Sequence, residues 1–170
     1  KVVIADNLAQ FVSPVYEHAG TVSWMYLAIA VVFFSFQIYC DFSGYSDIAI
    51  GAARVMGFRL MENFKLPYRS TGVGMFWSKW HISLSTWFRD YVYIPLGGNR
   101  KGAGRTSLNL FIVFAISGLW HGANWTFVVW GMLHGLWLVV ENRMNVRWEG
   151  KWKVVVGTML TFVGVSFLWI

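Results

Sequence analysis

The stretch Leu108–Val140, LNLFIVFAISGLWHGANWTFVVWGMLHGLWLVV, contains 33 residues and no Asp, Glu, Lys or Arg. As one straight helix it would measure about 50 Å, whereas the hydrocarbon core of a bilayer is about 30 Å thick. One crossing cannot accommodate it, so we expect the stretch to turn back on itself. The natural place for the turn is Trp120-His121-Gly122-Ala123-Asn124-Trp125.

Basic segments flank this uncharged stretch on both sides. Gly97–Arg105 carries three basic residues and no acid, and Glu141–Lys153 carries four basic residues against two acids. Loops rich in Lys and Arg stay on the cytoplasmic side of membranes. Both ends are therefore predicted to be cytoplasmic, with arms of roughly 12 to 16 residues, or about 18 to 24 Å of helix. This arrangement places His121 within the membrane.

The composition supports a membrane protein. Hydrophobic residues make up 56% of the chain and charged residues 13%, against about a half and a quarter in soluble domains. Disorder is excluded, and the 11 Trp residues are typical of a protein that places rings at membrane interfaces. With only Cys40 present, neither an intrachain disulfide framework nor a zinc–thiolate cluster can form.

The net charge of +6 raises the question of nucleic acid. The basic residues lie between apolar blocks and not along one solvated face, so we interpret them as membrane-flanking charges. No nucleic-acid partner is expected, whereas membrane lipid is. The predicted fold class is all-α, a polytopic transmembrane helical bundle.

The N-terminal part predicts further membrane segments. Thr21–Cys40 is 20 residues without a charge and is the clearest transmembrane helix, whereas Lys1–Ala19 is mildly amphipathic and is expected along the interface. Asp41–Phe58 is a second apolar stretch, in which a helix would put Asp47 and Arg54 on one face. A buried ion pair or a helix end at the interface explains these two charges.

Met75–Leu96 is too polar for a simple span, because it mixes Trp and Phe rings with Lys, His, Arg and Asp. We predict an amphipathic helix that lies in the interface or re-enters the bilayer. In such a helix Ser78, His81 and Ser85 would share one polar face. These polar side chains could line a cavity, and they could equally form the polar face of an interfacial helix.

Three histidines are candidates for chemistry. His121 lies inside an apolar segment, where an ionisable side chain is by default a functional candidate, and imidazole titrates close enough to neutrality to act as a base. Gly122 would leave room for a substrate or another backbone to approach closely, and Asn124 offers donors for an oxyanion. A structural histidine within the bundle is the alternative, which also suits His81 and is the preferred interpretation of His134. Their spacing matches no local zinc signature, so no metal site is predicted.

Phe76–Gly98 and Trp120–Trp125 are two histidine-containing motifs that follow each other along the chain. They resemble the signature and the second histidine motif of the membrane-bound O-acyltransferase family, most closely of its alginate O-acetylase branch. Asp41–Asp47, Asn63–Ser70 and the opening Val3–Leu8 resemble further blocks. The resemblance runs in order over nearly the whole chain.

The resemblance implies an acyltransferase of the bacterial inner membrane that moves an acyl group, usually acetyl, toward hydroxyls of an exported polysaccharide. It implies that residues 1–170 are one part of a larger catalytic domain, without its N-terminal helices and its C-terminal end. It implies an acetyl-CoA or acyl-carrier-protein thioester as co-substrate with no bound cofactor, and a periplasmic or membrane-anchored partner acetyltransferase beside the polysaccharide export machinery. The implied catalytic residues are His121 and His81. The supporting residues expected around them are Asn124, His134, Asp41, Trp120 and Ser85.

Other functions stay open at this point. A related branch with the same histidine motifs transfers D-alanine to teichoic acid, and lipid-linked glycans are further acceptors to consider. Intramembrane histidines also suit a transporter or channel, and a purely structural part of a larger complex would tolerate the loss of all three histidines. Consumption of a thioester donor separates the enzyme from the transporter.

Overall fold

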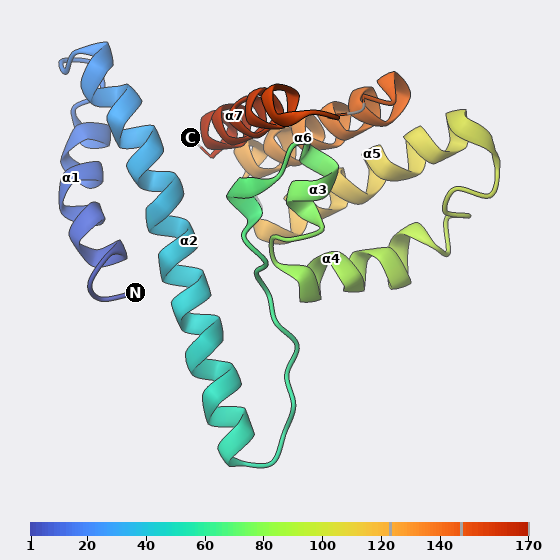
Figure 1. Cartoon of the computed structure of the whole chain (residues 1–170), viewed down its shortest axis with the longest axis horizontal. Coiled ribbons are helices and arrows are strands. Elements are labelled where there is room, and N and C mark those ends of the chain that lie inside the picture. The colour runs from blue at the N-terminus through green and yellow to red at the C-terminus, as the bar shows by residue number, and fades with distance from the viewer. Residues whose placement is uncertain (123, 147, 170) are drawn as a thin grey trace. The chain divides into compact units, whose positions relative to one another are not determined.

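The computed structural model describes residues 1–122, 124–146 and 148–169. It is all-α, as predicted, and the described residues form no strand beyond one antiparallel bridge between Phe64 and Trp80. The chain forms two compact units, one of residues 1–63 with the residues from Val163 onward, the other of Phe64–Phe162 (Figure 1). Ala123 of the second histidine motif and Arg147 of the basic segment lie outside the described residues.

The first unit is built on one long helix. α2 runs over Trp24–Val55, 32 residues or about 48 Å, and so continues through the predicted boundary near Cys40. The apolar stretch from Asp41 is therefore the end of this helix and not a second element. Asp47 and Arg54 are both exposed and no ion pair joins them among the described residues, so the predicted buried pair does not form. A charge that points outward interrupts no backbone hydrogen bond, and for this reason the helix continues.

α1, Ala5–Glu17, packs against α2. Rings make the contact, with the centroids of Phe11 and Phe33 5.3 Å apart and those of Tyr16 and Phe34 5.6 Å apart. The apolar side of the predicted amphipathic segment therefore faces a helix of the same chain.

The second unit contains the predicted hairpin. α5 covers Gly102–His121 and α6 covers Trp125–Met144, and the two lie side by side (Figure 1). Each arm has 20 residues, about 30 Å, so the predicted arm lengths were too short. The helices continue past the charged residues at their outer ends. A helix of this length is long enough to reach across a bilayer core, and the depth of His121 in the membrane stays a prediction.

Glycines bring the two arms of the hairpin close together. A Cβ on Gly131 would collide with the carbonyl oxygen of Phe114 and lie 2.9 Å from the Cα of Gly118. A Cβ on Gly135 would lie 2.9 Å from the Cβ of Phe114. Gly131 and Gly135 are four residues apart, the small-residue spacing by which helices pack closely in membranes.

The segment predicted as a single helix over Met75–Leu96 is broken. Its elements are α3 (Val73–Trp77), α4 (Ile82–Phe88) and the π-helix η2 (Arg89–Tyr93), and the 3₁₀ turn η1 (Pro67–Arg69) precedes them. The break lies at His81, whose backbone is left-handed with φ 48° and ψ 55°. The predicted stripe of Ser78, His81 and Ser85 is therefore wrong, because no continuous helix aligns these residues.

α7, Lys151–Leu168, follows the basic segment. Within the second unit, a Cβ on Gly157 would lie 2.9 Å from the carbonyl oxygen of Thr71 and 2.6 Å from the ring of Trp148. Among the described residues, three helices are long and apolar enough to cross a membrane, namely α2, α5 and α7.

Candidate active site

The second unit places the three candidate histidines in one row with indole rings between them. The ring centroids of His81 and Trp120 are 6.5 Å apart, and those of Trp120 and His121 are 4.9 Å apart. The row continues from His121 to Trp130 at 5.2 Å and from Trp130 to His134 at 5.0 Å. The structure therefore brings together residues that are 53 positions apart in the sequence.

His121 occupies the turn of the hairpin. It is the last residue of α5 and its side chain is exposed at the surface of this unit. Gly122 follows, and a Cβ there would lie 2.5 Å from the ring of Phe127. The absence of a side chain at Gly122 thus lets a ring of the same chain approach closely, and the approach of a substrate there stays a prediction. The exposed imidazole itself remains accessible.

His81 sits at the corner between α3 and α4. It is half-buried, and burial lowers the pKa of its imidazole to about 4, with a smaller contribution from the nearby His121. The ring is therefore neutral at physiological pH and one of its nitrogens can accept a proton or a hydrogen bond. The Oγ of Ser85 donates to the carbonyl oxygen of Trp77 at 3.1 Å and lies 3.4 Å from that of Trp80. Ser85 thus holds the corner that carries His81.

His134 is fully buried, on α6. Its Nδ1 lies 3.3 Å from the indole Nε1 of Trp77. An indole N–H only donates, so Nδ1 must be the acceptor and the proton of the neutral ring is on Nε2. His134 is thus a packed histidine, and its supporting role for the other two histidines stays a prediction.

The remaining predicted residues have local partners. Asn124 is the N-cap of α6, where its Oδ1 accepts from the backbone N–H of Thr126 at 3.2 Å. Its role as an oxyanion donor stays a prediction for the side-chain amide group. Asp41 belongs to the first unit, and its carboxylate pairs with the Lys1 Nζ at 3.0 Å. Trp120 contacts both His81 and His121.

Sequence reasoning missed three residues of this region. Trp130 and Trp77 complete the row of rings, and the spacing of Trp130 four residues before His134 was the available signal for the first of them. Glu141 was assigned to a cytoplasmic loop, yet it lies on α6 and its carboxylate accepts from the backbone of α3. Nothing in the local sequence indicates that partner.

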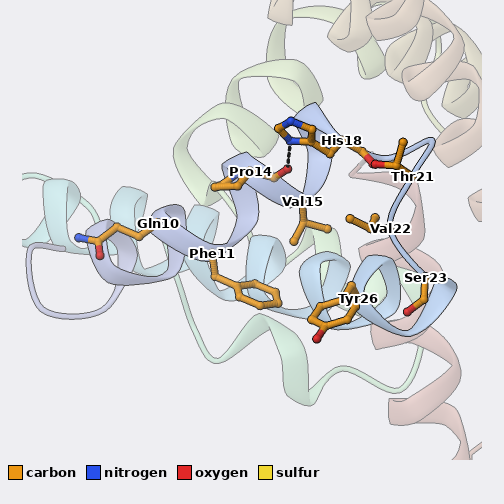
Figure 2. Close-up of a pocket in the computed structure, with 9 residues that line it drawn as sticks. All are labelled: Gln10, Phe11, Pro14, Val15, His18, Thr21, Val22, Ser23 and Tyr26. Carbon is orange, nitrogen blue, oxygen red and sulfur yellow. Dashed lines mark hydrogen bonds between the residues drawn. The ribbon is translucent and has the colours of Figure 1, made fainter.

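In the described part of the chain, no group of three or more His, Cys, Asp and Glu side chains is arranged to hold a metal ion. A cavity of about 520 Å³ lies in the first unit, between α1 and the start of α2 (Figure 2). It holds His18, whose Nδ1 lies 2.9 Å from the carbonyl oxygen of Pro14, but none of the three candidate histidines. Its lining residues are Gln10, Phe11, Pro14, Val15, His18, Thr21, Val22, Ser23 and Tyr26.

Residues 3–149 match the model of the membrane-bound O-acyltransferase family. The chain belongs to this family. The match includes all three histidines of the row and both arms of the hairpin, so the geometry described above is that of a membrane-bound O-acyltransferase.

Curated proteins resemble the chain over most or all of its length. The probable alginate O-acetylase AlgI of Pseudomonas putida is 45% identical over 173 residues, covering 100% of this chain and 35% of that protein. The peptidoglycan O-acetyltransferase of Helicobacter pylori is 39% identical and covers 100% of this chain and 33% of its own length. The teichoic acid D-alanyltransferase of Bacillus subtilis is 29% identical, over 79% of this chain and 38% of its own length. The chain thus spans about a third of the length of the curated relatives it matches.

Proposed function

We propose that this chain is part of a larger membrane O-acyltransferase, which moves an acetyl group from a cytoplasmic thioester donor toward hydroxyls of an exported polysaccharide. One observation carries the proposal. Two imidazoles, His81 and His121, come from separate elements and both contact the ring of Trp120. Acyl transfer to an alcohol requires a base at the attacking hydroxyl, and an imidazole is the side chain best suited to that task near neutral pH.

The proposed reaction assigns the steps to specific groups. The hydroxyl oxygen attacks the thioester carbonyl carbon while His121 accepts the hydroxyl proton, and the tetrahedral intermediate then expels the thiolate, which takes up that proton. His81, held neutral by burial, orients a reactant or shares the role of base. The amide group of Asn124 or an indole N–H would stabilise the oxyanion.

The location and partners of the protein are further parts of the proposal. Helices long enough to cross a bilayer and the bacterial relatives support a multi-pass protein of the bacterial inner membrane. Exported polysaccharide lies outside that membrane. A periplasmic or membrane-anchored acetyltransferase is therefore the expected partner that receives the acyl group and completes the modification.

The decisive experiment replaces the histidines in the full-length protein. His121→Ala should lower acetylation of the surface polysaccharide, and release of coenzyme A from acetyl-CoA, by about 10²–10⁴-fold, because that is the usual contribution of a general base. His81→Ala should also cause a large loss. His18→Ala is the matched control, since His18 is exposed and belongs to the other unit. Normal acetylation in His121→Ala would exclude the assignment.

Two other outcomes identify the alternatives. Deacylation of a D-alanyl carrier protein in place of acetyl-CoA would move the protein to the D-alanyl branch, whose Bacillus subtilis member is 29% identical to this chain. The higher identity of the O-acetylating relatives favours acetyl. A donor that stays intact while a solute crosses the membrane would indicate a transporter.

A further inference from the structure

A carboxylate from α6 holds the beginning of α3. The Oε2 of Glu141 accepts from the backbone N–H of Val73 at 2.6 Å, and its Oε1 accepts from that of Gly74 at 3.1 Å. These N–H groups belong to the first turn of α3, where no carbonyl of the same helix is available to them. A negative charge at the N-terminus of a helix is also favoured by the helix dipole. The bond joins residues 68 and 67 positions apart.

The absence of a side chain at Gly72 leaves room for that carboxylate. A Cβ on Gly72 would lie 2.7 and 2.8 Å from the two carboxylate oxygens of Glu141. Any larger residue at position 72 would push the carboxylate away from the two N–H groups. The hydrogen bonds of Glu141 therefore depend on the glycine at position 72, although 69 positions separate the two residues.

The same face of α6 also holds the other end of α3. His134 lies seven residues before Glu141, which is two helical turns. Its Nδ1 accepts from the indole of Trp77, the last residue of α3. Both ends of this short helix are thus fixed to α6 by side-chain hydrogen bonds.

His81 follows α3 by four residues and has a left-handed backbone, φ 48°. A non-glycine residue in that region stores strain, which persists only where the surrounding structure over-determines the conformation. Here α6 fixes α3 on one side of the corner, and on the other side Ser85 of α4 bonds the carbonyl oxygen of Trp77. The backbone of Lys79 accepts from Lys65 at 3.0 Å, which fixes the intervening residues.

We infer that Glu141 is a positioning residue for acyl transfer, which holds His81 beside Trp120 and His121 through α3. The inference rests on the proposed function for its kinetic test. Glu141 acts at a distance from the reacting atoms, so it should affect the rate of the chemical step and leave donor binding unchanged.

The test uses Glu141→Gln in the full-length protein in membranes. Glutamine has the same length, but its NH₂ group would face a backbone N–H where an acceptor is required. We expect kcat to fall about 10-fold to 10²-fold, as for a small misplacement of a catalytic group, with KM for the thioester donor unchanged. Glu62→Gln is the matched control, because Glu62 is exposed and in the other unit, and it should change neither parameter.

A second readout reports the corner itself. The rate at which diethylpyrocarbonate modifies His81 is measured by mass spectrometry, with the exposed His18 as internal reference. This rate should rise about threefold or more in Glu141→Gln, because the corner opens locally. Gly72→Ala should give the same two changes, and it replaces Glu141→Gln should that variant not fold. In a Glu141→Ala background Gly72→Ala should add little, since no carboxylate is left to displace.

The outcomes separate the inference from the proposed function. Wild-type kcat and unchanged His81 modification in Glu141→Gln would overturn the inference, as would a loss of kcat with unchanged His81 modification. A wild-type protein that transfers no acyl group would overturn the proposed function, while the change in His81 modification would still test the placement of His81 by Glu141.

Discussion

Two corners of the second unit carry an imidazole each, and they are built in different ways. The corner at His121 ends a helix of 20 residues, and the next helix begins at Trp125 with Asn124 as its cap. The corner at His81 lies between two helices of five and seven residues and needs a left-handed backbone. Helices this short have little stability of their own. Contacts from elsewhere must therefore hold the His81 corner, whereas the helices themselves hold the His121 corner.

The difference predicts which substitutions matter at each corner. The position of His121 depends on close packing between α5 and α6, where Gly118 and Gly131 meet. The position of His81 depends on the few hydrogen bonds that the side chains of Ser85, His134 and Glu141 make. Substitutions that disturb helix packing should displace His121, and loss of one hydrogen-bonding side chain should displace His81.

The largest effect is expected from Gly131→Leu, which breaks the packed corner. A Cβ at this position already collides with the carbonyl oxygen of Phe114, so the arms must separate and both His121 and His134 move. We expect a loss of stability of about 1–3 kcal/mol or more and loss of acyl transfer by about 10²-fold. Thermal unfolding in detergent measures the loss of stability, and an acetyl-transfer assay measures the loss of activity. Gly104→Ala on the same hairpin meets nothing within 4 Å, so wild-type behaviour there is the control.

The strained corner is tested by comparing His81→Val with His81→Asn. Asn tolerates a left-handed backbone, whereas a β-branched side chain is a severe outlier there. Both variants lose the imidazole and should lose acyl transfer, but only His81→Val should also lose stability, by about 1–2 kcal/mol relative to His81→Asn. Equal thermal stability of the two variants would mean that the backbone at His81 is not held left-handed.

A smaller effect is expected at the cap of the second helix. Asn124→Ala removes the acceptor for the N–H of Thr126 and should cost about 1 kcal/mol of stability. Asn124→Asp keeps the acceptor and removes the amide donor. Normal stability with reduced kcat in Asn124→Asp would support an oxyanion role for that donor, and unchanged kcat would limit Asn124 to the cap.

The last prediction concerns the pH dependence of stability, an effect that is absent above about pH 6.5. Burial lowers the pKa of His81 to about 4, below the ordinary value near 6.5, so below pH 6.5 the unfolded chain binds a proton that the folded chain does not. The stability contributed by the neutral ring is therefore complete above about pH 6.5 and declines as the pH falls toward 4. His81→Asn should show a shallower decline over this window. The carboxylates are the same in the wild type and in His81→Asn, so their contribution cancels when the two curves of stability against pH are subtracted. Parallel curves would contradict the prediction.

Much of the helical architecture could be predicted from the sequence. The uncharged run Leu108–Val140 predicted a hairpin with its turn at Trp120–Trp125, and the structure confirms both. The boundaries were less accurate, because a helix is continued by its backbone bonds and does not end at a charge. For the same reason α2 passes through Asp41, where a boundary was predicted, and continues beyond Asp47.

The sequence by itself determined the apolar helices and the candidate histidines, because hydrophobic runs and rare ionisable side chains among apolar residues are local features. Only the tertiary structure decided that Met75–Leu96 breaks at His81, that indole rings join the three histidines, and that Glu141 caps α3. These features depend on contacts between residues up to 68 positions apart. Short helices are not stable by themselves, so they need a tertiary partner. The fold determines which residue is that partner, and the sequence near the helix does not indicate it.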